Sequence, residues 1–166
     1  LASFFKKKNI EKAIFSSEND ISFNISKKLK LKNIDIETKI NLNHLVVKNN
    51  FEDLKTYLPN LEKVINFKNH AIKIKYNKDK LSIKGNGKIL VKDKLDSIKY
   101  EVIKNKSKFI FFTKTNLKNS KILIDSLDYK KKENSDASIL INGNFKKNDK
   151  INFDLISLSE KKNIIA

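Results

Sequence analysis

The two histidines, His44 and His70, are the first residues whose type could support catalysis or metal binding. Both lie in or beside runs of alternating apolar and polar residues, and neither has acidic or histidine neighbours at the spacing of a metal site. We therefore expect both to be ordinary strand-end residues. Cysteine is absent from the chain, which excludes a thiolate ligand, a cysteine nucleophile and a disulfide.

Two further patterns resemble parts of catalytic sites but lack the remaining residues. The sequence Gly85-Asn86-Gly87 begins like a phosphate-binding loop, yet neither a helix nor a Lys-Ser/Thr pair follows it. A hairpin bend or a bulge is the better interpretation. Acidic pairs fall in expected caps or turns, where nothing would bury them and raise the pKa of a carboxyl group; they are Glu52/Asp53, Asp93/Asp96 and Glu133/Asp136. The sequence predicts no enzyme, no cofactor and no metal site.

Lysine gives the chain its charge. Among 166 residues there are 36 Lys+Arg and 19 Asp+Glu, a formal net charge of +17. Such a balance often indicates nucleic-acid binding, because neutralised phosphates supply most non-specific affinity. Here every basic residue is Lys, and Arg, which dominates bidentate phosphate and base contacts, is absent. The lysines are also spread over the whole chain, so we expect mainly a solvated face, which argues against a nucleic-acid partner.

Alternation with a period of two runs through most of the chain. Ile21, Phe23 and Ile25 alternate with polar residues, and the pattern continues across Leu29 and Leu31. Beyond residue 70, similar runs are separated by turn residues at intervals of roughly 8–14 residues, as in an antiparallel meander. The sequence predicts an all-β fold with about ten strands.

The alternation is interrupted near residues 50–65. Asn50 suits a helix N-cap, and Pro59 limits the helix that follows to about two turns. A second short helical stretch is predicted from Asn60 to Ile65. We expect one short helical insertion here, with a possible sub-boundary of the domain at the same place.

Each predicted strand has one apolar and one polar face, and the apolar faces must be buried. The pattern is compatible with a second sheet packed as a sandwich, with a closed barrel, or with a curled trough that holds apolar ligands. Three glycines are few for the corners of a small barrel, but enough for a gently curled, open sheet. Because the chain contains no Met, we expect residues 1–166 to be a single β-rich segment of a longer, repeat-like protein.

Several short motifs in roughly residues 60–166 resemble the AsmA-like family of bacterial envelope proteins (the YhdP/TamB type). In that family, a strand ending in Tyr-x-Lys is followed by a strand ending in Gly and by a corner of the form Leu-x-Glu-x-x-Asn. The matching segments here are Phe67–Tyr76, Leu81–Gly87, Leu127–Lys131, Ile139–Gly143 and Ser157–Asn163.

The resemblance implies a long periplasmic protein of a Gram-negative bacterium, anchored in the inner membrane by a helix outside these residues. It implies a curled, groove-like antiparallel sheet that conducts phospholipids toward the outer membrane and supports outer-membrane biogenesis and integrity of the cell envelope. The partners are then the acyl chains of phospholipids and the inner membrane.

The alternation within strands selects the residues of such a lipid-binding groove. The predicted lining is Ile72, Ile74, Tyr76, Leu81, Ile83, Ile98, Tyr100, Val102, Phe109, Phe111, Ile139, Ile141, Phe153 and Leu155. Two alternatives stay open: a cationic β-sandwich that binds nucleic acid or an anionic glycan, and a purely structural β-repeat whose apolar faces pack on each other.

Overall fold

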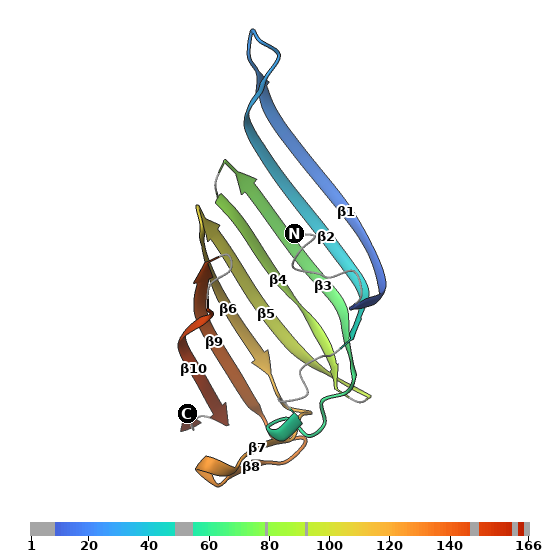
Figure 1. The fold of residues 1–166 in the computed structure, drawn as a ribbon. Helices are drawn as coiled ribbons and strands as arrows, with labels where there is room; N and C mark the ends of the chain where they lie inside the picture. The colour runs from blue at the N-terminus through green and yellow to red at the C-terminus, as the bar shows by residue number, and fades with distance from the viewer. Residues whose placement is uncertain are drawn as a thin grey trace.

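The computed structural model describes residues 9–48, 55–78, 80–91, 93–146, 150–160 and 163–164. Residues 163 and 164 are described by their backbone only. The described chain is all-β and is dominated by long antiparallel strands (Figure 1). The strands are β1 (Ile10–Ile25), β2 (Leu31–Lys48), β3 (Val64–Asn77), β4 (Lys80–Val91), β5 (Lys94–Asn105), β6 (Lys108–Asn116), β7 (Ile122–Ile124), β8 (Tyr129–Lys131), β9 (Ala137–Lys146), β10 (Asn152–Glu160) and β11 (Asn163–Ile164).

Nine of these strands form one sheet in the order β1-β2-β3-β4-β5-β6-β9-β10-β11. Every pair is antiparallel, and neighbours in the sheet follow one another in the chain except at the β6–β9 pair. Between β6 and β9, the chain makes an excursion in which β7, a 3-10 turn (η2, Asp125–Leu127) and β8 form a separate two-stranded ribbon. The predicted antiparallel meander is confirmed.

The first third of the chain continues the same sheet. β2 pairs with β3 from Asp35 opposite Asn77 to Lys48 opposite Val64. The strands before and after the predicted helical insertion are therefore direct neighbours in one sheet. Residues 49–54, which include Asn50, lie outside the described residues, and a 3-10 turn occupies residues 55–56. The predicted helical stretch from Asn60 to Ile65 is wrong, because β3 begins at Val64. There, pairing with β2 outweighs the local helical spacing.

The two ends of the sheet differ, and we name them by what they carry. The closed end carries the excursion of residues 117–136 and residues 55–61. The open end carries the turn between β1 and β2, whose hairpin projects past the neighbouring strands (Figure 1). The buried hydrophobic cluster lies at the closed end and consists of Leu117, Ile122, Ala137 and Leu158, with Leu58, Ile124, Tyr129 and Ile139 packed against it.

Candidate functional site

One side of the large sheet, here called the apolar face, is the candidate site. Its centre is a row of directly paired residues in which Ile74 faces Ile83, Ile83 faces Val102, and Val102 faces Phe111. Because directly paired residues share a face and alternate residues along a strand return to it, the register places every predicted lining residue except Leu155 on this side.

Leu155 lies on the opposite side, so the expectation that it lines the same surface as Phe153 is wrong. Phe153 pairs with Gly143, but the next pair is Leu155 with Asn142, and the extra residue, Asp154, forms a β-bulge. A bulge reverses the alternation, and Ile156 therefore takes the place on the apolar face that Leu155 was expected to hold. The change of parity from Phe153 to Ile156 in the sequence is the signal that could have identified it.

The sequence interpretation missed the part of the apolar face that β1 and β2 supply. Ile21 pairs with Ile36 and Ile25 with Leu31, and Ile36 in turn pairs with Tyr76 of β3. The apolar face therefore extends from the central strands onto the projecting hairpin.

The apolar face has no second layer over most of its area in the part of the chain that the structure describes. Its central residues are only half-buried, and towards the two edges Ile21 is 59% and Phe153 57% exposed. Contiguous apolar surface of this kind is unusual in a soluble protein and marks a surface that meets a partner or ligand.

All three glycines of the chain lie beneath aromatic rings on the apolar face. Tyr100 covers Gly85, His70 covers Gly87 and Phe111 covers Gly143, so that a Cβ on any of these glycines would collide with the ring above it. None of them has a positive φ; their role is to let rings lie flat along the sheet. Gly85 and Gly87 lie inside β4, so the hairpin bend predicted there is wrong, and the bulge is in the facing strand β3.

His70 is a buried member of β3 rather than the strand-end residue that was expected. Asn69 adopts a left-handed conformation (φ 52) and shifts the register of β3 against β4, which turns His70 onto the apolar face. There the imidazole is 3% exposed; its Nε2 lies 3.1 Å from the Lys88 carbonyl and its Nδ1 3.3 Å from the Tyr100 hydroxyl. An Nε2–H donor to the carbonyl leaves Nδ1 to accept from Tyr100. Burial lowers the pKa of His70, so a neutral ring fits this place.

His44 is also in the interior of a strand, β2, but on the other side of the sheet. Its Nε2 lies 3.0 Å from Asn66 Oδ1. No group of three His, Asp or Glu side chains that could hold a metal ion occurs among the described residues.

A buried carboxylate ties the closed end together. Asp96 is 3% exposed in β5, although the sequence suggested a solvated turn. Its oxygens accept hydrogen bonds from the backbone N–H and the side-chain amide of Asn119, and Oδ2 accepts from the Ser120 hydroxyl. The carboxylate thus fixes the start of the excursion against β5. By contrast, Asp93 is exposed, and Glu52 and Asp53 lie outside the described residues.

Lys131 is the second buried charge of the closed end, and it departs from the expected solvated role of the lysines. Its side chain donates three hydrogen bonds to backbone carbonyls, of Lys118 (3.2 Å), Ser120 (2.7 Å) and Lys132 (2.9 Å). Lys131 is 2% exposed, and this burial lowers its pKa. The nearby carboxylates of Asp96 and Glu160 act on the pKa in the opposite direction. The ammonium group thus joins the first residues of the excursion to its last ones.

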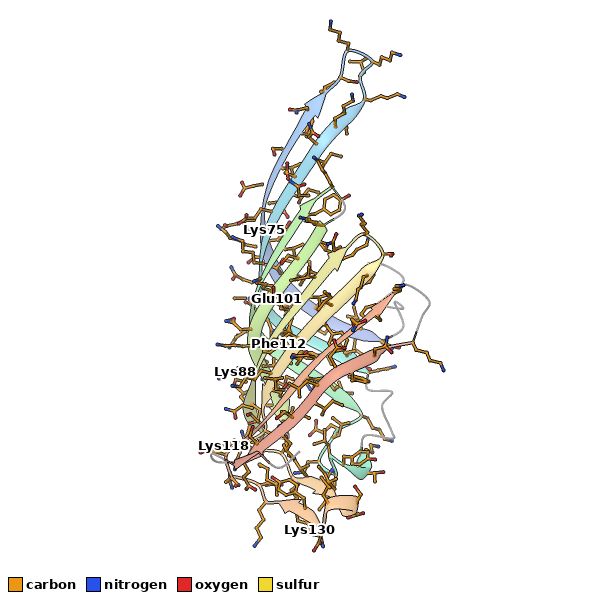
Figure 2. All side chains as sticks on the ribbon, turned by 90° about the vertical axis from the view of Figure 1, so that its left-hand side faces the viewer. Lys75, Lys88, Glu101, Phe112, Lys118 and Lys130 are labelled. Carbon is orange, nitrogen blue, oxygen red and sulfur yellow. The ribbon has the colours of Figure 1, made fainter. Side chains whose placement is uncertain are left out.

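Lysines crowd the opposite side of the sheet, here called the polar face. Lys39, Lys73 and Lys84 lie side by side on β2, β3 and β4. Lys75 and Lys88 project from the same face of the sheet (Figure 2). A shallow hollow of about 570 Å³ is lined by Lys39, Lys73, Lys84 and Lys99, together with Glu101 and Phe112. Glu37 binds Lys73 and Lys75, whose hydrogen bonds lower the pKa of its carboxyl group to about 2.

Comparison with models of known protein families, with curated proteins and with solved structures finds no match to this chain. Among the described residues there is no helix long and apolar enough to cross a membrane.

Proposed function

We propose that the apolar face holds the acyl chains of phospholipids, as a segment of a lipid-conducting groove of an AsmA-like protein. The observation that carries the proposal is the uncovered apolar surface that runs from the closed end to the tip of the β1–β2 hairpin. An acyl chain needs continuous apolar contact, worth about 0.8 kcal/mol per buried methylene. Rows such as Ile74–Ile83–Val102–Phe111 offer that contact across neighbouring strands.

The proposed groove is a curled sheet with one closed end. Rings that lie flat over Gly85, Gly87 and Gly143 would leave space for a chain above the centre of the sheet, and the polar face would keep the outside hydrated. The setting we propose is the periplasm of a Gram-negative bacterium, with the inner membrane reached through a helix outside these residues. Phospholipid transport toward the outer membrane is the corresponding role.

The test uses a double variant at the centre of the apolar face, Ile74→Asp with Phe111→Asp. Native mass spectrometry of the purified chain should show bound phospholipid in the unmodified protein and little or none in this variant. A matched control, Ser82→Asp with Phe112→Asp, adds the same charge on the polar face and should keep its lipid. Phe153→Asp, at a position 57% exposed, gives a second apolar-face variant that does not depend on the packed centre.

Bound lipid that survives both apolar-face changes would contradict the proposal, as would an unmodified protein that binds no lipid when mixed with phospholipid. Circular dichroism of each variant separates loss of binding from loss of the fold.

A second candidate function is supported by the polar face, where paired lysines surround the hollow beside Phe112. Lys73 and Lys84 pair with Glu37 and Glu101, but lysines outnumber carboxylates around the hollow. Like charges directly opposite each other destabilise a sheet, and an anionic glycan or nucleic acid would neutralise the excess positive charge. This function predicts affinity for heparin or single-stranded DNA that falls steeply with salt and is lost in Lys39→Gln with Lys84→Gln. Unchanged binding in that variant would refute it.

A further inference from the structure

The tip of the β1–β2 hairpin combines exposed apolar side chains with a dense group of lysines. Beyond the Asp35–Asn77 pair, β2 has β1 as its partner, so residues 22–34 project from the sheet as a two-stranded arm (Figure 1). On this arm, Phe23 is 49%, Ile25 58%, Leu31 57% and Leu29 85% exposed. Leu29 was expected within a strand but stands at the apex of the turn.

The turn places Leu29 outward at a cost in backbone energy. Its N–H donates to the Ser26 carbonyl at 2.8 Å, and the Lys30 N–H donates to the Ser26 hydroxyl at 3.1 Å. Leu29 itself has φ 55, a left-handed conformation that Gly or Asn adopts far more readily than a bulky residue. Lys78 and Lys106 adopt the same conformation in the β3–β4 and β5–β6 turns, so the high exposure of Leu29 is what distinguishes the β1–β2 turn.

Among the described residues, the open end carries a strongly positive charge. In the described residues at or beyond the row of Asp35 and Asn77, the acidic residue is Asp35, and its carboxylate accepts a hydrogen bond from the Asn77 amide. The lysines of this end are Lys27, Lys28, Lys30, Lys32, Lys78, Lys80, Lys106, Lys108, Lys146 and Lys150. Figure 2 shows nitrogen-tipped side chains spreading from the hairpin tip.

The closed end carries charges of both signs, because carboxylates are interspersed with its lysines. Its described acidic residues include Asp93, Asp125, Asp128, Glu133, Asp136 and Glu160. The molecule is therefore polarised along its strands, with the exposed apolar tip at the cationic end.

We infer that the tip docks into the surface of a bilayer that contains anionic phospholipid, with Leu29 and its apolar neighbours below the headgroups and the lysines among them. Exposed apolar side chains flanked by lysines are the chemistry of interfacial membrane binding, and each lysine near an anionic surface strengthens binding roughly fivefold. Since the apolar side of the arm continues into the apolar face, a docked tip brings the open end of that face to the hydrocarbon. Docking itself does not require that the face carries lipid.

The experiment is flotation of the chain with vesicles of phosphatidylcholine alone and of phosphatidylcholine with an equal amount of phosphatidylglycerol. We expect binding only to the second kind, and binding that weakens as salt is raised. Replacement of Lys27, Lys28, Lys30 and Lys32 by Gln should weaken binding on the order of a hundredfold or more. Leu29→Ser should weaken it roughly tenfold, as expected when a Leu side chain no longer leaves water.

Matched controls remove the same groups at the other end. Replacement of Lys63, Lys121, Lys130 and Lys132 by Gln, all exposed, changes the net charge equally, and Leu127→Ser removes a 53% exposed Leu from the closed end. Both controls should float like the unmodified chain. The inference is overturned if no vesicle binds, if tip variants and controls behave alike, or if the tip variants abolish only self-association in size-exclusion chromatography. Native mass spectrometry of the Leu29→Ser chain keeps this result separate from the proposed function, because lipid held on the apolar face should remain.

Discussion

The two ends of the sheet treat one apolar face in opposite ways. At the closed end, the chain folds back over it, and the buried Asp96 and Lys131 bind the excursion through hydrogen bonds to its backbone. At the open end, the same face runs onto a hairpin whose apolar residues stay exposed. The comparison teaches that alternation, corrected by bulges, produces the face, whereas the buried cluster and its polar anchors mark where the chain covers it.

The largest effect is expected from removing the anchor of the closed end. Lys131→Met keeps much of the side-chain volume but leaves three buried carbonyls without their donor, which should lower the free energy of unfolding by about 3 kcal/mol. Urea denaturation measures the change. The control is Lys130→Met, at the exposed neighbouring position, with an expected change within about 0.5 kcal/mol; equal losses in both variants would show that Lys131 is no anchor.

A smaller loss is expected where an aromatic ring lies over a glycine. In Gly143→Ala, the new methyl group would collide with the Phe111 ring and with the Asn152 carbonyl, which cannot move away as a flexible side chain could. We expect destabilisation by about 2 kcal/mol, measured by thermal or urea unfolding. Asn86→Ala, on the exposed polar face of β4, should be close to neutral, and a tolerated Gly143→Ala would contradict the account of the flat ring.

The stability of the fold should depend on pH through His70, which is buried on the apolar face between the two ends. Burial lowers the pKa of His70 in the folded state, so the unfolded chain binds the proton more readily and stability is lost as the pH falls below about 6.5. Unfolding followed from pH 7.5 to 5.5 should show this decline, and His70→Asn should flatten it. An identical slope in the variant would assign the decline to other groups.

The smallest effect on stability is expected at the open end. Leu29→Ser at the hairpin apex should change the free energy of unfolding by less than about 0.5 kcal/mol, because the side chain is 85% exposed. The same urea titration that reports on Lys131→Met checks it. A loss of several kcal/mol would mean that the tip packs against another part of the chain or a second copy in solution.

The sequence was sufficient to predict the strands and most of the apolar face, since alternation with a period of two directly encodes which side of a sheet a residue occupies. It failed at the bulges. Asn69 and Asp154 each add a residue that reverses the alternation, and Leu155 was consequently assigned to the wrong side. The shifts of parity from Phe67 to Ile72 and from Phe153 to Ile156 were present in the sequence, but the prediction assumed an unbroken alternation within each strand.

The closed end could not be predicted because its contacts join residues far apart in the chain. Nothing near Asp96 in sequence indicates that Asn119 and Ser120 will surround it. Likewise, Lys131 is the middle one of three consecutive lysines, and nothing in the sequence distinguishes it from the other two. It is buried because residues 129–132 fold back against residues 118–120. The tip of the hairpin was missed for a related reason, since Leu29 fits the alternation and only the Ser26 turn removes it from a strand.

The order of the strands has a consequence for how the sheet assembles. From β3 to β6, each strand is joined to its partner by a short turn, so these hairpins can close locally with little loss of loop entropy. The β2–β3 and β6–β9 pairs must instead wait for longer connections, residues 49–63 and 117–136. We expect these two junctions to form after the β3–β6 hairpins, so amides that join β6 to β9 should gain protection from hydrogen exchange later than those that join β3 to β4 during refolding.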